Sequence, residues 1–452
     1  MTTTKQLYLL YQQHPVISTD TRKIANNSLF FALKGDKFDA NVFAKQAIEA
    51  GAAYAVIDNP EYKLGDRYLL VDDVLTSLQD LARHHRRQLN IPVIGLTGTN
   101  GKTTTKELIN TVLSQHFKTQ ATQGNLNNHI GVPLTILTID ATHEVAVIEM
   151  GANHQKEIEL LCSIAQPSHG LITNVGKAHL EGFGGVEGVK KAKGELYDYL
   201  RGAGSEWREP GKDQACVFIN SDDDILTKMA ADRGLNNIIY YGNTGASNLV
   251  SGEIVENAPL LTLRWTNNAK RESYTIKTQL TGAYNLNNIL AAISIGTYFN
   301  LTTNQINNGI EGYQPKNNRS QIVQTATNTL ICDYYNANPS SMVVAIENVG
   351  KIDAKRKVLI LGDMFEMGQE SIAEHTAVIK KAFDTPVDER IFIGKDFSAA
   401  ANDIKQSTTG KNSFYPTADD AILGLRANPI KNSTVLIKGS RGMALERLVE
   451  LF

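Results

Sequence analysis

A glycine-rich segment carries the clearest chemistry in the sequence, Thr97-Gly-Thr-Asn-Gly-Lys-Thr-Thr104. It follows an apolar run and precedes a helical pattern, which is the position of a phosphate-binding loop. Gly98 and Gly101 would let backbone N–H groups approach phosphate oxygens, and the helix N-terminus would favour an anion. Lys102 would reach the outer phosphates of a nucleoside triphosphate, and the Thr103 hydroxyl would bind Mg²⁺. Because the usual motif has glycine at position 96, where this chain has leucine, we predict a variant loop rather than a glycine turn with a surface lysine.

Several acids, a histidine and a lysine could complete such a site. Glu149 ends an apolar run, and Asp333 and Asp363 end two others near the C-terminus. Acids at the carboxyl ends of parallel strands face the ligand crevice, and Mg²⁺ prefers oxygen ligands. His179 follows another predicted strand, and Lys193 lies in a predicted helix. By spacing alone, these residues could equally be an ordinary strand-end acid, a structural histidine and part of a solvated basic face.

Asparagines are dense in two segments, 125–128 and 285–288. Amide side chains both donate and accept hydrogen bonds, so they suit nucleotide bases and peptide groups. They are equally common in turns, so the asparagines alone favour neither interpretation.

The elements that must position these residues form three βα-rich stretches, 1–85, 86–313 and 314–452. Predicted strands lie at 92–97, 145–149, 170–174, 329–333, 357–361, 390–393 and 434–437. They are continuous apolar runs separated by helical patterns, which is typical of parallel strands buried on both faces. A helix is predicted over 73–90 as the link between the first two stretches, and a surface loop over 201–214. The predicted fold class is therefore α/β, with three domains and doubly wound sheets.

Composition limits the function classes. The chain has 452 residues, of which 42% are hydrophobic and 20% charged, and its net charge is −2. There is no basic excess for a nucleic-acid partner. Three separated cysteines form neither a disulfide framework nor a zinc pattern. Because no signal-peptide pattern opens the chain and no apolar run approaches about 18 residues, we expect a cytoplasmic protein without a membrane span.

Taken together, the motifs resemble the Mur ligase family from about residue 18 to residue 446, in the family's order. The segments that carry the resemblance are Thr19-Asp-Thr-Arg-Lys23, Thr122 to Pro133, Glu149-Met-Gly-Ala-Asn153, Thr173 to His179 and Gly282 to Asn288. In the last third, Tyr335 to Met342, Leu361 to Gly368 and Lys438 to Met443 resemble the branch that adds a D-alanyl dipeptide.

The resemblance implies a fold and an activity. Residues 1–85 would bind a UDP-muramyl peptide, 86–313 would form an ATP-binding P-loop domain, and 314–452 a Rossmann-like ligase domain. The implied reaction is ATP-dependent amide-bond formation, in which D-alanyl-D-alanine is added to UDP-N-acetylmuramoyl-tripeptide through an acyl phosphate. Peptidoglycan would be built from the resulting pentapeptide. The implied cofactors are ATP and Mg²⁺, with two ions and a carbamate on Lys193. We expect a monomer that acts on small molecules and a crevice between the second and third domains that closes on binding.

The resemblance also assigns roles to individual residues. The implied ATP contacts are Gly98, Thr99, Asn100, Gly101, Lys102, Thr103, Thr104, Asn285, Asn288, Arg319 and Asp333. The implied metal-site residues are Thr103, Glu149 and His179, and the implied catalytic residues are Lys102, Lys193 and His179. The implied UDP-substrate residues are Thr21, Arg22, Lys34, Asn125, Asn127 and Asn128. The implied residues of the acceptor domain are Asn336, Asn338, Asp363, Met364, Ser440 and Arg441.

Three alternatives remain open at this point. A folate-glutamate ligase would share the P-loop but would have no use for the N-terminal Thr-Asp-Thr-Arg segment. A regulatory nucleotide switch would not need the third stretch, and the sequence has no Asn-Lys-x-Asp guanine-reading motif. A non-catalytic UDP-sugar-binding protein would not need the intact Gly101-Lys-Thr103. The sequence does not indicate whether the third residue of the peptide is lysine or diaminopimelate.

Overall fold

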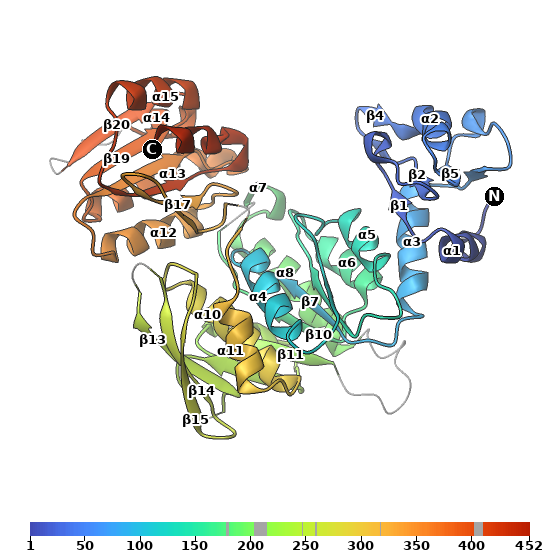
Figure 1. The fold of residues 1–452 in the computed structure, drawn as a ribbon, viewed down its shortest axis with the longest axis horizontal. Helices are drawn as coiled ribbons and strands as arrows, with labels where there is room; N and C mark the ends of the chain where they lie inside the picture. The colour runs from blue at the N-terminus through green and yellow to red at the C-terminus, as the bar shows by residue number, and fades with distance from the viewer. Residues whose placement is uncertain (178–179, 203–214, 246, 258–259, 317, 402–409) are drawn as a thin grey trace.

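Three α/β domains follow one another along the chain, and the two terminal domains lie on either side of the middle one (Figure 1). The computed structural model describes all residues except 178–179, 203–214, 246, 258–259, 317 and 402–409. The three-domain α/β prediction is confirmed. Within the described part of the chain, no helix is long and apolar enough to cross a membrane.

The N-terminal domain has a parallel four-stranded sheet of order β1-β2-β5-β6. Its strands are β1 (Ile17–Ser18), β2 (Leu29–Phe31), β5 (Tyr54–Ile57) and β6 (Tyr68–Leu70), and β3 (Lys34–Gly35) and β4 (Phe38–Asp39) form a small hairpin. Its helices are α1 (Thr4–Gln13), α2 (Ala44–Glu49) and α3 (Val74–Arg86). Asp73 caps α3 by accepting from the Thr76 N–H, so this helix begins close to the predicted position.

The middle domain is built on a nine-stranded sheet of order β15-β14-β13-β12-β11-β10-β7-β9-β8. The strands are β7 (Val93–Thr97), β8 (Thr119–Ala121), β9 (Val145–Glu149), β10 (His169–Ile172), β11 (Cys216–Asn220), β12 (Ile238–Gly242), β13 (Val250–Glu256), β14 (Thr262–Asn267) and β15 (Glu272–Lys277). The helices are α4 (Lys102–Leu113), α5 (Gly131–Ile136), α6 (Glu157–Ala165), α7 (Leu180–Phe183), α8 (Val186–Arg201), α9 (Asp224–Asp232), α10 (Asn285–Tyr298) and α11 (Thr303–Glu311). Strands β13 to β15 pair antiparallel, which the sequence analysis did not predict.

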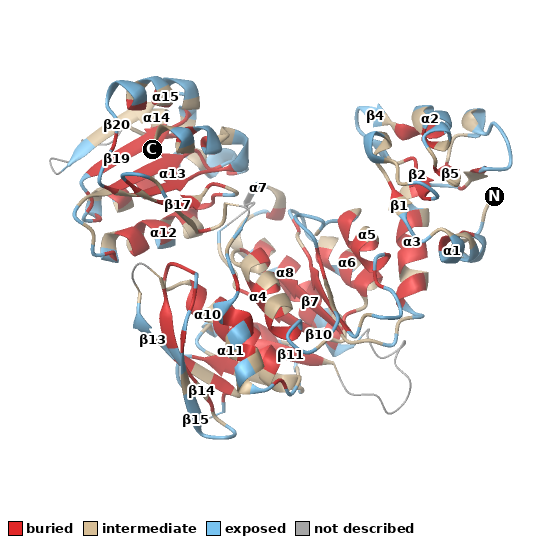
Figure 2. Ribbon diagram, in the orientation of Figure 1, coloured by how far each residue is buried: buried red, intermediate tan, exposed pale blue. Residues whose placement is uncertain are grey.

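Alternation along the central strands explains why helices cover both faces of this sheet. In β9, Ala146 and Ile148 join the core beneath α6 and α8, whereas Val145 and Val147 join the core beneath α4 and α10. Successive side chains of a strand point to opposite faces, so a fully apolar strand needs helices packed against both faces of the sheet. Figure 2 shows these central strands as buried. The predicted loop over 201–214 lies almost entirely outside the described residues.

The C-terminal domain has a six-stranded sheet of order β16-β17-β21-β18-β19-β20, parallel except for β16. Its strands are β16 (Gln321–Gln324), β17 (Thr329–Asp333), β18 (Lys357–Gly362), β19 (Glu389–Ile393), β20 (Lys411–Tyr415) and β21 (Thr434–Lys438). The helices are α12 (Pro339–Lys351), α13 (Ser371–Asp384), α14 (Lys395–Ala400) and α15 (Ala418–Ala427). The four predicted strands of this domain are β17, β18, β19 and β21.

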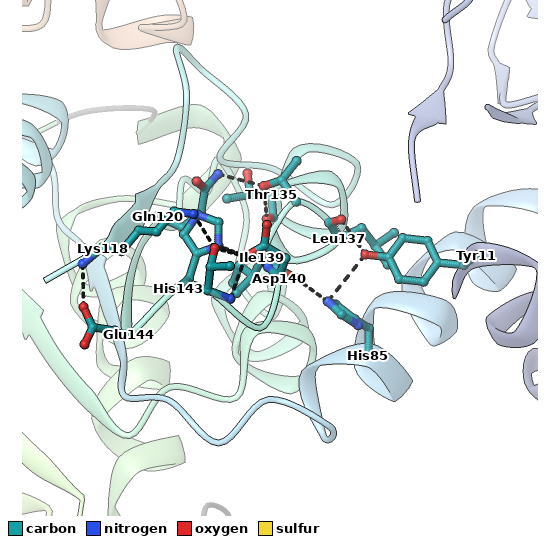
Figure 3. Close-up of polar contacts among 12 residues, drawn as sticks. Tyr11, His85, Lys118, Gln120, Thr135, Leu137, Ile139, Asp140, His143 and Glu144 are labelled. Carbon is teal, nitrogen blue, oxygen red and sulfur yellow. Dashed lines mark hydrogen bonds and ion pairs between the residues drawn. The ribbon is translucent and has the colours of Figure 1, made fainter. Parts of the chain in front are cut away.

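The N-terminal domain is joined to the middle domain through α1 and α3. One hydrophobic core runs from the N-terminal sheet through Leu78 and Leu81 of α3 to α5 and α6. Figure 3 shows the polar part of this junction, where the Tyr11 hydroxyl donates to the Leu137 carbonyl at 2.7 Å. His85 Nε2 lies 2.7 Å from the Ile139 carbonyl, so it carries the proton and donates. Because His85 Nδ1 is buried without a partner among the described residues, this histidine is held neutral.

The buried His85 makes the junction sensitive to acid. Burial lowers the pKa of His85, and the neighbouring His84 and Arg86 act in the same direction, against the hydrogen bond to Ile139. The unfolded chain takes up this proton near pH 6.5, and the folded chain does so only at lower pH. The contribution of neutral His85 to stability is therefore complete above about pH 6.5 and is lost as the pH falls below that value.

We expect His85→Gln to remove this part of the pH dependence, because glutamine can still donate to Ile139 but does not titrate. The measurement is the free energy of unfolding by denaturant between pH 5 and pH 8. The difference between wild type and variant should change by up to about 1.4 kcal/mol per pH unit below about pH 6.5. His154→Gln, which replaces an exposed histidine of the middle domain, is the control. A difference that does not change with pH would contradict this account of His85.

Candidate functional site

Most of the predicted site residues surround one cavity between the middle and C-terminal domains, with a volume of about 840 Å³. The walls come from segments far apart in the sequence. Those predicted residues that line it are Thr99, Asn100, Gly101, Lys102, Thr103, Thr104, Asn125, Asn127, Asn128, Glu149, Asn285, Asn288, Arg319, Asp333, Asn336 and Asn338. A large concave site with convergent polar groups between two domains is the usual form of a small-molecule site.

The phosphate loop connects β7 to α4 and depends on two glycines. Gly98 has φ +146° and Gly101 has φ +78°, which are conformations that other residues rarely adopt. A Cβ atom on Gly98 would lie 2.0 Å from the Thr173 hydroxyl oxygen. The Asn100 carbonyl accepts from this hydroxyl at 2.6 Å, and the Thr99 N–H donates to the Asn174 carbonyl at 3.0 Å. The loop therefore lies against the carboxyl end of β10, with no space for a side chain at Gly98.

Lys102 is the cation of the loop. Its ammonium group donates to the carbonyls of Gly98 and Thr99, at 2.7 and 3.0 Å. The pKa of Lys102 is lowered to about 8, chiefly by burial; the charge of Glu149 opposes this shift and that of Arg319 adds to it. A phosphate group at the loop would restore the charged form, because an adjacent anion favours the ammonium.

Glu149 has the environment of a carboxylate prepared for a cation. It is 1% exposed, and its Oε1 accepts from the Thr103 hydroxyl at 3.2 Å and the Asn127 amide at 2.8 Å. Its Oε2 is buried without a hydrogen-bond partner among the described residues. A buried, partly unpaired carboxylate is costly unless a cation compensates it. The oxygens of Thr103 and Glu149 therefore fit Mg²⁺, which takes few protein ligands and completes its shell with water and phosphate.

Other members of the predicted metal site are less well defined. His179 lies outside the described residues. Within the described ranges, no three His, Cys, Asp or Glu side chains gather as a metal cluster. A site for Mg²⁺ bound to a nucleotide does not need such a cluster, because phosphate oxygens supply the remaining ligands.

Lys193 is not on a solvated face, so that interpretation is wrong. It is 2% exposed, and its ammonium nitrogen lies 5.3 Å from the centroid of the Phe183 ring. Burial lowers the pKa of Lys193 to about 7, and the charge of Lys102 contributes, whereas Glu157 and Glu195 oppose the shift. On the same helix, Lys190 faces outward and pairs with Glu187 at 2.6 Å. Helical spacing did not distinguish the buried Lys193 from the outward-facing Lys190, because residues three positions apart lie on neighbouring parts of one helix.

The C-terminal domain contributes a polar chain to the cavity wall. The Lys438 ammonium donates to Asp333 Oδ2 at 2.6 Å, and Asp333 Oδ1 accepts from the Ser320 N–H at 3.3 Å. The Ser320 hydroxyl lies 2.6 Å from the Tyr284 hydroxyl of the middle domain. Lys438 was not among the predicted site residues. Its signal was its position at the end of a predicted strand, which is the same signal that identified Asp333.

The predicted asparagines of α10 support the loop from behind. The Asn285 amide donates to the Thr281 carbonyl at 2.8 Å, and the Asn288 amide donates to Asn285 Oδ1 at 2.9 Å. Asn288 Oδ1 accepts from the Thr105 hydroxyl of α4 at 3.0 Å. These bonds hold α10 against α4, so much of the polar capacity of both asparagines is used within the protein.

Arg319 is oriented by an aromatic ring. Its guanidinium carbon lies 3.9 Å from the centroid of the Tyr335 ring, and that of Arg441 lies 5.4 Å from the same ring. Arg319 and Tyr335 both line the cavity. Stacking on an aromatic face restricts a flexible side chain, so Arg319 is held as a cation of the cavity wall. Tyr335 is the first residue of a motif that carries the family resemblance, but it was not predicted as a site residue.

Some predicted residues do not line this cavity. Thr21, Arg22 and Lys34 belong to the N-terminal domain, where Arg22 pairs with Asp20 at 2.7 Å and Lys34 pairs with Asp58 at 2.8 Å. Arg22 and Lys34 are therefore each paired with an acid of their own domain.

In the C-terminal domain, Asp363, Met364 and Ser440 are buried and hold a loop in place. Asp363 accepts from the N–H groups of Asp396 and Phe397, and burial raises the pKa of its carboxyl group. His375 Nε2 lies 3.6 Å from Asp363, but it accepts from the Met364 N–H, so the two residues do not form an ion pair. The loop presents Glu366 to the cavity with φ +63°.

The close approach at Gly98 yields a stability prediction. Gly98→Ala should destabilise the protein by about 1–3 kcal/mol, because the new methyl group would overlap the Thr173 hydroxyl and its φ is unfavourable. Gly35→Ala is the matched control, since a Cβ there meets nothing within 4 Å. Denaturant unfolding of both variants provides the measurement. Equal stability of Gly98→Ala and Gly35→Ala would show that the loop does not lie against Thr173.

Comparisons with known proteins agree with this architecture. Three family domains match in order: "Mur ligase family, catalytic domain" over residues 15–86, "Mur ligase middle domain" over 96–296 and "Mur ligase, glutamate ligase domain" over 318–441. The UDP-N-acetylmuramoyl-tripeptide–D-alanyl-D-alanine ligase of Bacillus subtilis (strain 168) is 34% identical over 442 residues, covering 96% of this chain and 92% of the relative. The ligase of the same name from Escherichia coli (strain K12) is 34% identical over 434 residues, with the same coverage.

Among solved structures, a crystal structure of MurF from Acinetobacter baumannii has a TM-score of 0.83 and 30% sequence identity. It covers 96% of this chain and 92% of that chain. With three domains in order, a cavity that joins two of them and relatives matched over nearly their full length, this chain belongs to the Mur ligase family.

Proposed function

We propose that this chain is the ligase that adds D-alanyl-D-alanine to UDP-N-acetylmuramoyl-tripeptide, with ATP as the energy source. The product would be the pentapeptide precursor of peptidoglycan. The observation that carries the proposal is the cavity in which the phosphate loop of the middle domain faces the C-terminal domain. Support also comes from the two relatives that bear this name and are 34% identical along 96% of the chain.

Each domain would have its own part in this reaction. Residues 1–85 would hold the UDP end of the substrate with Thr21, Arg22 and Lys34, and Asn125, Asn127 and Asn128 would lie along the muramyl peptide. Residues 86–313 would bind ATP, with Arg319 and Asp333 of residues 314–452 completing its site. Asn336, Asn338, Asp363, Met364, Ser440 and Arg441 would build the acceptor side. We also propose a monomeric, cytoplasmic enzyme, because UDP-linked precursors and ATP are substrates of the cytoplasm.

The first chemical step would activate the terminal carboxylate of the tripeptide. A carboxylate oxygen attacks the γ-phosphorus of ATP, the bond to the bridging oxygen breaks, and ADP leaves. Because the transferring phosphoryl group is strongly anionic, catalysis depends on positioning and on positive groups. Lys102 and Arg319, both in the cavity wall, would stabilise that charge.

In the second step, the amine nitrogen of the dipeptide attacks the acyl carbon. A tetrahedral intermediate forms and collapses, phosphate leaves with the electron pair of the C–O bond, and the amine loses a proton. The cavity would hold the amine and the acyl phosphate together and keep water away, which contributes through proximity.

Thr103, Glu149 and His179 are the residues that would hold Mg²⁺. When bound, the ion would neutralise charge on the phosphate oxygens. We further propose that Lys193 carries a carbamate beside a second ion. A lysine whose pKa is lowered to about 7 by burial is partly neutral near pH 7, and the neutral amine is the form that reacts with CO₂.

Replacement of Lys102 tests the phosphate loop. Lys102→Ala should fold, because among the described residues its ammonium group bonds only to carbonyls of its own loop. Its rate of phosphate release should fall by at least about 100-fold, the scale for one electrostatic group in a transition state. Lys228→Ala, which removes an exposed lysine paired with Asp232, is the control. Near-normal turnover by Lys102→Ala would refute the proposed role.

The substrate assignment is tested by phosphate release over a matrix of substrates. Wild-type enzyme is given ATP and Mg²⁺ with UDP-muramyl tripeptides that end in lysine or diaminopimelate, and with D-alanyl-D-alanine, single amino acids or no acceptor. A separate reaction contains a folate and glutamate instead. We expect release only when both a UDP-tripeptide and the dipeptide are present. Release with a folate and glutamate would instead identify a folate ligase, and release without any acceptor would favour a nucleotide switch.

A further inference from the structure

Asn100 of the phosphate loop is bonded to two domains at once. Its main chain belongs to the middle domain, because its N–H donates to Asn174 Oδ1 at 3.0 Å and its carbonyl accepts from Thr173. Its side chain turns to the C-terminal domain. Asn100 Oδ1 accepts from the Asn338 amide at 2.8 Å, and Asn100 Nδ2 donates to the Ser340 hydroxyl at 3.3 Å.

The partner residues stand at the first turn of α12. Asn338 caps this helix, with its Oδ1 accepting from the Ser341 N–H at 2.9 Å. The Ser340 hydroxyl also lies 3.3 Å from the Lys177 carbonyl of the middle domain. Asn338 is 5% exposed, so its amide has little access to water. Loss of the contact to Asn100 would therefore leave a buried donor without its partner, which makes the contact energetically significant.

We propose that Asn100 and Asn338 are a positioning pair that couples the phosphate loop to the C-terminal domain, so that nucleotide binding and dipeptide binding strengthen each other. The inference rests on the proposed function for the identity of the two ligands. Neither side chain needs to touch a reacting atom. The same hydrogen bonds join the phosphate loop, which would hold the nucleotide, to the start of α12, which lies beside the proposed acceptor side. A loop arrangement that nucleotide favours would therefore also favour the position of the C-terminal domain that the dipeptide requires.

Coupling of this kind is reciprocal. If bound nucleotide raises the affinity for the dipeptide by some factor, bound dipeptide must raise the affinity for nucleotide by the same factor. The two domains also share an ion pair between Lys177 and Glu374, at 2.7 Å. Because this ion pair does not involve the phosphate loop, it would remain when the asparagine contact is removed. Loss of the asparagine pair should therefore reduce coupling while the domains stay associated.

The test is the affinity for a non-hydrolysable ATP analogue, measured by calorimetry with Mg²⁺ and UDP-tripeptide, with and without D-alanyl-D-alanine. The main variant is Asn338→Ser, because serine still caps a helix but is too short to reach Asn100. In wild type, we expect the dipeptide to raise the affinity for the ATP analogue by about tenfold, which is the scale of one or two hydrogen bonds. In Asn338→Ser, this factor should fall to near one, with the affinity for the analogue alone changed by less than about twofold.

Two further variants separate coupling from general damage. Asn59→Ser makes the same change at the cap of a short helix in the N-terminal domain, where Asn59 accepts from the Glu61 N–H. It should keep the wild-type coupling. Asn100→Ala combined with Asn338→Ser should lose no more coupling than either change alone, since the two residues act as one contact. In steady state, the KM for dipeptide should rise more than kcat falls.

Equal coupling factors in wild type and Asn338→Ser, including no coupling in either, would overturn the inference. That result would leave the proposed function intact as long as the wild-type enzyme releases phosphate with the dipeptide. Absence of that release would instead overturn the proposed function itself.

Discussion

The contact between the phosphate loop and the end of β10 is the constraint on which the site depends. At Gly98 the backbone passes so close to Thr173 that a single methyl group would not fit. The backbone of Asn100 is then fixed by Thr173 and Asn174, and α4 begins at Lys102 with its N-terminus facing the cavity. Every other feature of the site is arranged around this fixed loop. Glu149 lies at the end of β9, the strand that pairs with β7. Helix α10 supports the loop from behind, and the C-terminal domain contacts it from the other side.

Much of this arrangement could be predicted from the sequence, because it rests on local patterns. Apolar runs that end in an acid located β9 and β17, and glycine spacing located the loop between β7 and α4. Strand ends share one edge of a parallel sheet, so residues such as Glu149 and Thr103 could be expected to meet. The division into three α/β domains followed from the same alternation of strands and helices.

Other features depend on tertiary contacts that a local pattern does not contain. The burial of Lys193 is set by the packing of α8 against the sheet, and no charge pattern distinguishes it from Lys190. The antiparallel strands β13 to β15 are mixed in polarity and partly exposed, so they lack the continuous apolar runs by which the central strands were predicted. The orientation of Asn100 toward Asn338 joins residues more than two hundred positions apart, and motif spacing carries no information about it. Tyr335 was missed for the same reason, because its stacking against Arg319 is also a tertiary contact.

The asparagine contact also brings the first turns of two helices to one place. Helix α4 begins at Lys102, and α12 begins at Pro339, directly after the residue that touches the loop. The peptide dipoles of each helix leave partial positive charge at its N-terminus. Two such ends beside one cavity create a local field that attracts anions, although the whole chain has a net charge of −2. Because this field arises from backbone geometry, it does not titrate, and it persists at pH values where Lys102 loses its proton.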